Sequence, residues 1–263
     1  MPRYPGAQRP AGFAPTTHYT PGHQGRVAVC LHICEGPFES SITHLRNEGL
    51  SAHFVISEAG TIAQPVDTDH SAWANGLSFD DGRWISPRNK IVFPTWQRIT
   101  PGVNPNLQTI SIEHAGIHTK PRPRAQLAAT VAVLRWLGVQ YPSLLPYVPA
   151  ASLIRHGMLD TIDRINCPGP HFDLAAIAAE ANAPAESWQR AWTRKGVALE
   201  HVDWAIPQLY KYHYLTLGAC VETERYTPGG QLSIAFFERG FIYYLAATQR
   251  AYLGPGLPPG VTL

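Results

Sequence analysis

The segment RHGMLDTIDRINCPGPHF, residues 155–172, constrains the fold of this chain more than any other part of the sequence. It places His156 eleven positions before Cys167, and the cysteine leads directly into a Pro-Gly-Pro turn. An imidazole nitrogen and a thiol on a rigid loop are two of the three protein ligands that a catalytic zinc ion needs. The third candidate is His32, in the segment VAVCLHICEG near the N-terminus. The fold must therefore bring distant parts of the chain to one point, and these residue types predict a zinc site of the kind that hydrolases use.

The strand that carries His32 is predicted to be buried. Residues 27–34 form a near-continuous apolar run, typical of a strand covered on both faces. Alternation along this run places Cys30, His32 and Cys34 on the same face. Either cysteine therefore competes with Cys167 as a metal ligand, but free cysteines are more often buried as small hydrophobic residues, and we expect that here.

The remaining pattern predicts an α/β fold, a mixed central β-sheet flanked by helices. Residues 106–116 predict a strand in which Glu113 lies on the face away from Ile110 and Ile112. The other expected elements are a hairpin over 52–66 that turns near Gly60, and helices over 126–141 and 173–182.

Changes in composition divide the chain into four predicted parts. They are a Pro-rich N-terminal arm over 1–24, the α/β domain over 25–183, a linker or bridging helix over 184–204, and a small β-rich C-terminal module over 205–263. Within the domain, residues 77–106 form a loop-rich insert of the kind that often makes a lid or a binding rim. The C-terminal module carries a predicted turn at Pro228-Gly229-Gly230 and the apolar run FIYYLAA.

Charge and cysteine content exclude several classes of protein. The net charge of +2 gives no reason to expect a nucleic-acid partner. The first 24 residues lack the apolar run of a signal peptide, and no stretch reaches the ~20 apolar residues of a membrane span. The four cysteines at 30, 34, 167 and 220 form no disulfide framework, which favours free thiols or metal ligands in a reducing compartment.

Five segments resemble, in order, the zinc-dependent type 2 N-acetylmuramoyl-L-alanine amidases, a family that includes peptidoglycan recognition proteins and phage amidase-type lysozymes. The resemblance runs from about Val27 to Leu174. The segments are LHICEG, SAHFVISEAGTIAQPV, DHSAWANG, TISIEHAG and RHGMLDTIDRINCPGPHFDL. The resemblance implies zinc-dependent cleavage of the amide between N-acetylmuramic acid and L-alanine in peptidoglycan.

The same resemblance assigns roles to individual residues. It implies that His32, His156 and Cys167 are the zinc ligands, in the branch of the family that uses cysteine in the third position. Glu113 stands where the family has its active-site glutamate and is the candidate general base; the alternative is a solvent-exposed strand carboxylate. His53 matches a position near the zinc, where it either contacts substrate or makes structural hydrogen bonds.

The chain departs from the family pattern at three places. Ile165 replaces a lysine that steadies the oxyanion in phage lysozymes, and Ala52 and Ala74 replace a tyrosine and a histidine. Arg164 is the candidate for the missing positive charge, because a guanidinium suits an oxyanion. The alternative is a surface arginine paired with Asp163 or Asp160.

The tail resembles, weakly, small LG-containing repeats of secreted and wall-associated bacterial proteins. It is expected either to bind wall polymer through aromatic side chains such as Tyr243 and Tyr244 or to pack as a structural flap. With the missing signal peptide, this favours a phage or prophage endolysin that stays in the host cytoplasm until lysis and then acts on peptidoglycan. The oligomeric state is left open by the sequence, and a monomer is favoured. The alternatives are a cytosolic recycling amidase and a non-catalytic peptidoglycan-binding protein, whose relatives typically lack a zinc ligand.

Overall fold

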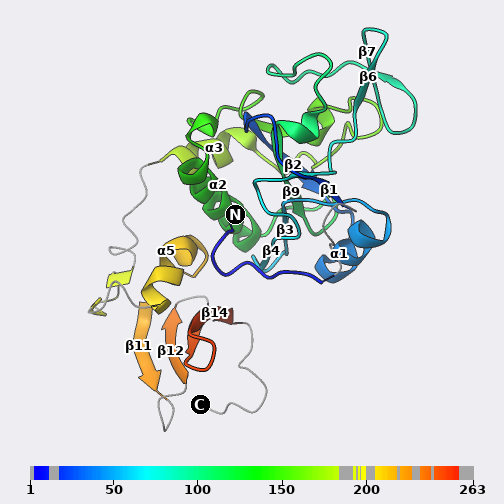
Figure 1. The fold of residues 1–263 in the computed structure, drawn as a ribbon. Helices are drawn as coiled ribbons and strands as arrows, with labels where there is room; N and C mark the ends of the chain where they lie inside the picture. The colour runs from blue at the N-terminus through cyan, green and yellow to red at the C-terminus, as the bar shows by residue number, and fades with distance from the viewer. Residues whose placement is uncertain are drawn as a thin grey trace. The chain divides into compact units, whose positions relative to one another are not determined.

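The computed structural model forms two compact units, residues 1–183 and 184–263 (Figure 1). The residues that the structure describes are 3–11, 18–183, 192–193, 195, 197–199, 205–217, 220–226, 232–237 and 240–254. The predicted linker over 184–204 and the turn at 228–230 therefore lie largely or wholly outside the described residues. None of the described helices combines the length and apolarity needed to cross a bilayer.

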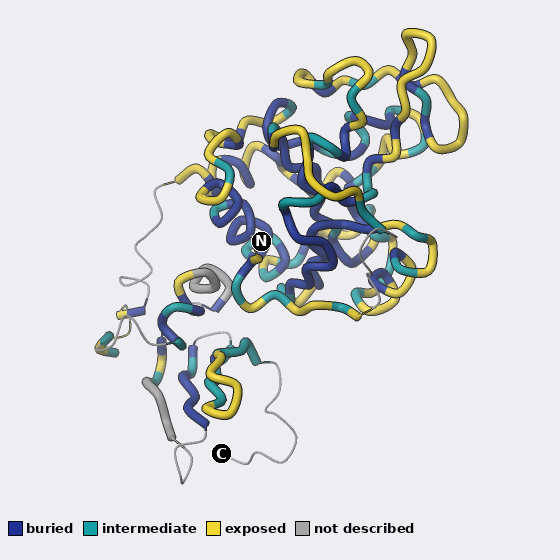
Figure 2. The backbone as a smooth tube through the Cα atoms, in the orientation of Figure 1, coloured by how far each residue is buried: buried dark blue, intermediate teal, exposed yellow. Residues whose placement is uncertain are grey.

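The first unit is built on a five-stranded mixed sheet with the order β10-β2-β9-β3-β4. The strands are β2 (Ala28–Ile33), β3 (Phe54–Ile56), β4 (Ile62–Ala63), β9 (Thr109–His114) and β10 (Leu153–Arg155). All neighbours are parallel except β3 and β4, which form the predicted hairpin. Every residue of β2 is buried, so the expectation of a strand covered on both faces is confirmed. Figure 2 shows these strands as the buried centre of the unit.

Helices cover the two faces of this sheet, which confirms the predicted fold class. The helices are α1 (Phe38–Asn47), α2 (Arg124–Gln140) and α3 (Leu174–Asn182), with short 3-10 turns η1 (Pro105–Leu107), η2 (Pro142–Leu144) and η3 (His156–Met158). Phe54 of β3 packs edge-on against Trp136, so α2 lies on the face away from His32. Asp173 caps α3 by accepting hydrogen bonds from the backbone amides of Ala175 and Ala176.

Two segments expected to be an arm and a loop-rich insert make ordered contacts. In the predicted arm over 1–24, Tyr4 is buried against Phe54 and Trp136, and β1 (Tyr19–Thr20) pairs with β5 (Ser71–Ala72). The loop-rich insert over 77–106 also contains short strands. It folds into a small antiparallel sheet of β6 (Ser78–Asp80), β7 (Arg83–Ile85) and β8 (Ile91–Val92). Strands of two or three residues are too short to show a periodic sequence pattern.

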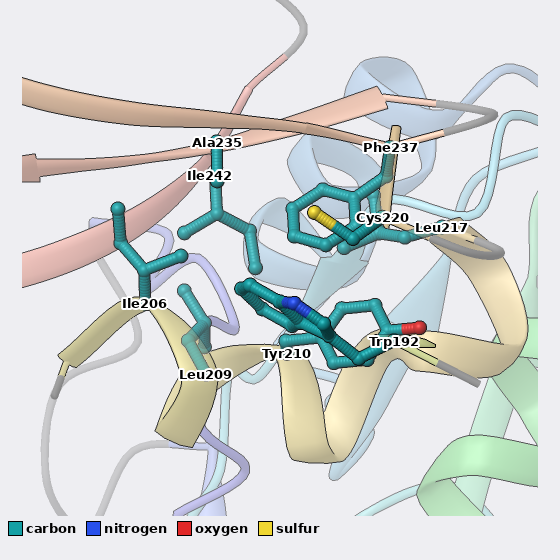
Figure 3. Packing of buried hydrophobic residues seen from close by; sticks show 9 residues of the cluster. All are labelled: Trp192, Ile206, Leu209, Tyr210, Leu217, Cys220, Ala235, Phe237 and Ile242. Atoms are coloured by element: carbon teal, nitrogen blue, oxygen red, sulfur yellow. The ribbon is translucent and has the colours of Figure 1, made fainter. Parts of the chain in front are cut away.

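The second unit is a four-stranded antiparallel sheet packed on one helix, as the β-rich prediction required. Its elements are α5 (Ala205–Leu217), β11 (Cys220–Tyr226), β12 (Leu232–Phe237), β13 (Gly240–Leu245) and β14 (Arg250–Gly254), in the sheet order β11-β12-β13-β14. Its core stacks Tyr210 on Phe237, with Trp192 edge-on to both rings (Figure 3). Tyr244 packs against this core, whereas Tyr243 lies on the other face of β13, stacked on Tyr252.

Candidate metal centre

Three side chains converge at the carboxyl end of the central strands. The ligand atoms of His32, His156 and Cys167 all lie within 4.8 Å of one another. The Nδ1 atoms of the two histidines are 3.0 Å apart. The structure therefore brings together the three residues that the sequence singled out, although 124 positions separate the histidines.

Strand pairing puts the two histidines side by side. β10 runs parallel to β2 with Arg155 opposite Leu31, so His156 follows directly after the last paired residue, level with His32. β2 ends one residue after His32, and both imidazoles therefore project at the same edge of the sheet. Because β2 and β10 are parallel, their carboxyl ends lie at the same edge of the sheet, and the residues that end them lie side by side.

Backbone hydrogen bonds hold the cysteine loop against the histidine turn. The Gly157 amide donates to the Cys167 carbonyl at 3.0 Å, and the Cys167 amide donates to the Arg164 carbonyl at 2.8 Å. The Ile33 amide donates to the Cys167 Sγ at 3.4 Å, which fixes the sulfur beside β2.

Two glycines permit this close approach. A Cβ on Gly157 would lie 2.6 Å from the Ile165 carbonyl oxygen and 2.8 Å from that of Arg164. Gly169 has φ +110, and a Cβ there would lie 2.3 Å from the His118 carbonyl oxygen. Both contacts are with backbone, which cannot turn aside as a flexible side chain can. The glycines that flank His156 and Cys167 in the sequence are therefore part of how the site is formed.

Glu113 lies next to His32 on β9, as the paired register of these two strands requires. Its Oε1 is 3.6 Å from His32 Nδ1, and its Oε2 accepts a hydrogen bond from the Cys34 thiol at 3.4 Å. The side chain is only 12% exposed, so Glu113 is not a solvent-exposed strand carboxylate. Burial raises its pKa to about 7, against the lowering effect of the Cys34 hydrogen bond and the Arg164 charge.

Burial also shifts the pKa values of the three converging side chains toward their uncharged forms. It lowers the pKa of His32 well below its usual value and that of His156 to about 3, and it raises the pKa of the Cys167 thiol above its usual value. Two neutral imidazoles and one sulfur are donors that Zn²⁺ accepts readily. Tetrahedral zinc at ordinary bond lengths separates such donors by ~3.4 to 3.6 Å, which small shifts of these side chains would reach. The residues therefore fit a zinc ion with three protein ligands.

The two other candidate catalytic residues differ in their surroundings. Arg164 is exposed, and its charge acts on Glu113 and the ligand residues through space. Its suggested partner Asp163 is bound by Lys90 and Arg88 instead. His53 is buried: its Nδ1 accepts the Ser111 amide at 2.9 Å, and its Nε2 lies 2.9 Å from the His70 carbonyl oxygen. Both ring nitrogens of His53 are thus engaged within the protein, which favours the structural alternative.

The competing ligands lie outside the cluster. Cys30 is fully buried among hydrophobic residues that include Trp84 and Trp96 from the insert. Asp160 accepts the backbone amides of Ile162 and Asp163, which closes a turn. The sequence did not predict that the Cys34 thiol would contact Glu113. Its strand face was correct, but its hydrogen bond to Glu113 depends on the path of the chain after β2.

Comparison with known proteins supplies independent information. A family model described as N-acetylmuramoyl-L-alanine amidase matches residues 16–170, more than half of the chain. The 1,6-anhydro-N-acetylmuramyl-L-alanine amidase AmpD of Salmonella typhimurium is 34% identical over 143 residues, which are 54% of this chain and 62% of that protein. The chain thus spans less than two thirds of the length of this curated relative.

Solved structures of lower identity also resemble the chain. A crystal structure of a selenomethionine derivative of AmpD gives a TM-score of 0.48 at 22% identity, covering 68% of this chain and 96% of that chain. The E. coli amidase AmiD, in complex with anhydro-N-acetylmuramic acid-L-Ala-D-gamma-Glu-L-Lys, gives a TM-score of 0.45 at 19% identity, covering 78% and 76%.

A methyl group at Gly157 is expected to open the site. In Gly157→Ala, the new Cβ must displace the backbone at Ile165 and Arg164, which moves Cys167 away from His156. We expect zinc affinity, measured by competition with a chromophoric chelator, to fall about 10- to 100-fold, the effect typical of lost support around a metal. Gly36→Ala is the matched control, because its Cβ would meet only the Ser41 hydroxyl oxygen at 3.7 Å. Unchanged affinity in Gly157→Ala would contradict this account of the loop.

Proposed function

Because this chain belongs to the N-acetylmuramoyl-L-alanine amidase family, we propose that it hydrolyses the amide between N-acetylmuramic acid and L-alanine in peptidoglycan, with a zinc ion held by His32, His156 and Cys167. The observation that carries the proposal is the convergence of these three donors beside the buried carboxyl group of Glu113. A non-catalytic peptidoglycan-binding role is less well supported, because all three ligand types are present together.

The metal supplies the chemistry that side chains alone lack. When bound, a zinc ion polarises the scissile carbonyl and lowers the pKa of water toward ~7. The chain supplies the three donors and a fixed position for each. The Ile33 amide, which donates to Cys167 Sγ, helps to hold the sulfur as a thiolate.

Glu113 is proposed to move the proton. Its Oε1 faces His32 Nδ1, on the side where the three donors meet, while its Oε2 is held by the Cys34 thiol. From this position its carboxylate can take a proton from the attacking water and then return it to the departing L-alanine nitrogen. The balanced result is addition of water across the amide, which leaves a lactyl carboxylate and a free amine.

Arg164 is proposed to stabilise the negative charge that develops on the carbonyl oxygen. Its guanidinium is not engaged by Asp163, and its charge already acts on Glu113 and His156. A guanidinium stabilises an oxyanion through directed hydrogen bonds and charge. His53 takes no part in this scheme beyond supporting the strand pair β3 and β9 through Ser111.

The second unit favours a wall-directed role, that of a phage or prophage endolysin released onto the wall at lysis. Tyr243 and Tyr252 stack at 5.4 Å on the sheet face opposite the hydrophobic core, and aromatic faces of this kind suit sugar rings. The alternative is a recycling amidase, supported by the similarity to the Salmonella 1,6-anhydro-N-acetylmuramyl-L-alanine amidase. Relative rates on intact sacculi and on soluble anhydro-muropeptides distinguish the two. Faster cleavage of sacculi supports the endolysin, and exclusive cleavage of soluble fragments excludes it.

Removal of the sulfur ligand is expected to abolish both metal binding and cleavage. Mass analysis of peptidoglycan digests should show stem peptides with a free L-alanine amine for the wild type and none for Cys167→Ser. Metal analysis should show about one zinc per wild-type chain and little in the variant. Cys220→Ala is the control, because that thiol lies in the hydrophobic core of the second unit. Cleavage at a different bond by the wild type would refute the proposed reaction.

Loss of the carboxylate at Glu113 should separate metal binding from turnover. Glu113→Gln keeps the size of the side chain but cannot accept a proton, so we expect kcat to fall about 10²- to 10⁴-fold. Zinc content should stay at the wild-type level, because Glu113 is outside the group of three converging donors. A variant with near wild-type kcat would remove Glu113 from the mechanism.

A further inference from the structure

Two buried polar atoms near the candidate metal centre lack a hydrogen-bond partner of ordinary geometry. One is Nε2 of His32, and the other is Oδ1 of Asn75. His32 is 1% exposed and Asn75 is also 1% exposed, so water cannot easily replace a missing partner. Buried polar atoms are almost always paired, and two such atoms in the same region call for a common explanation.

The orientation of the Asn75 side chain is fixed by its other contacts. Its Nδ2 donates to Thr109 Oγ1 at 2.7 Å, and its backbone amide donates to Asn106 Oδ1 at 2.7 Å. The Thr109 hydroxyl spends its only hydrogen on the Pro105 carbonyl at 2.8 Å, so it can only accept from Asn75. The amide nitrogen must therefore face Thr109, and Oδ1 must point the other way.

The His32 ring is constrained from its other side. Its Nδ1 faces His156 Nδ1 at 3.0 Å and Glu113 Oε1 at 3.6 Å, so Nδ1 is the nitrogen turned toward the three converging donors. A neutral imidazole that presents a lone pair at Nδ1 must carry its hydrogen on Nε2. Leu77, two residues after Asn75, packs in one cluster with Cys30, which lies on the same strand face as His32. Asn75 is also among the side chains that act on His32 as hydrogen-bond partners, so its amide lies beside this ring.

We propose that Asn75 is a positioning residue for the metal centre, whose Oδ1 accepts the Nε2–H of His32 and so keeps Nδ1 as the coordinating nitrogen. Histidines that bind metals usually donate their second ring N–H to such a partner, which fixes both tautomer and ring orientation. Asn75 is itself held by Thr109 and Asn106, so the support extends from the start of β9 to the ligand. The inference rests on the zinc site of the proposed function.

The test compares one variant that removes the Oδ1 acceptor of Asn75 with another that removes the hydrogen-bond partner of its Nδ2. Asn75→Ala removes the acceptor, and its zinc affinity should fall about 10- to 100-fold in a chelator competition assay. Thr109→Val removes the partner of Nδ2 and leaves Oδ1 in place, so its affinity should stay within about threefold of wild type even where stability falls. Asn75→Asp keeps an oxygen acceptor at this position and should retain wild-type affinity.

Nitrogen-15 NMR of the histidine rings gives a readout that does not depend on any variant folding. In the zinc-loaded wild type, His32 should show the tautomer with hydrogen on Nε2, and this hydrogen should exchange slowly. Coordination through Nε2, or equal zinc affinity in wild type and Asn75→Ala, overturns the inference while leaving the zinc site intact. Failure of the wild type to bind zinc overturns the proposed function and the inference with it.

Discussion

The parallel pairing of three strands is the constraint on which the rest of this structure depends. β10, β2 and β9 are neighbours, and their register sets His156, His32 and Glu113 at one level along a single edge. Adjacent strands lie only about 4.8 Å apart, so side chains on three successive strands can share one site. No local sequence element could achieve this, because 124 positions separate the two histidines. The order of the strands, rather than any motif alone, creates the cluster of donors.

Burial gives this cluster its chemical character. The imidazoles, the thiol and the carboxyl group all have pKa values displaced toward their uncharged forms, and desolvation is the largest cause for each. Burying an ionised thiol or carboxyl group away from water costs desolvation free energy. A divalent cation bound at this site would offset that cost for the Cys167 thiolate and the Glu113 carboxylate. The same dryness strengthens the attraction between the cation and its ligands.

Sequence reasoning identified the elements whose signal is local. Residue type and spacing indicated His156 and Cys167, and alternation along two strands placed His32 and Glu113 on suitable faces. The helices α2 and α3 were also predictable from the sequence, because their apolar residues recur with helical periodicity. Contacts made by irregular chain could not be predicted in this way. The position of Asn75 depends on two hydrogen bonds, to Asn106 and Thr109, more than thirty residues away in the sequence. The packing of Tyr4 depends on a tertiary contact with Trp136. Neither leaves a periodic trace in the sequence.

The insert over 77–106 shows how such irregular chain affects the chemistry. Asp163 accepts hydrogen bonds from Ser86 Oγ at 2.9 Å and Lys90 Nζ at 2.5 Å, which ties the small β6–β8 sheet to the loop between His156 and Cys167. Contact with Lys90 lowers the pKa of Asp163 and keeps it ionised. Because this carboxylate is engaged by the insert, it does not neutralise the adjacent Arg164. The Arg164 charge acts on Glu113 and His156 through space, and the insert contributes to the site without supplying a ligand.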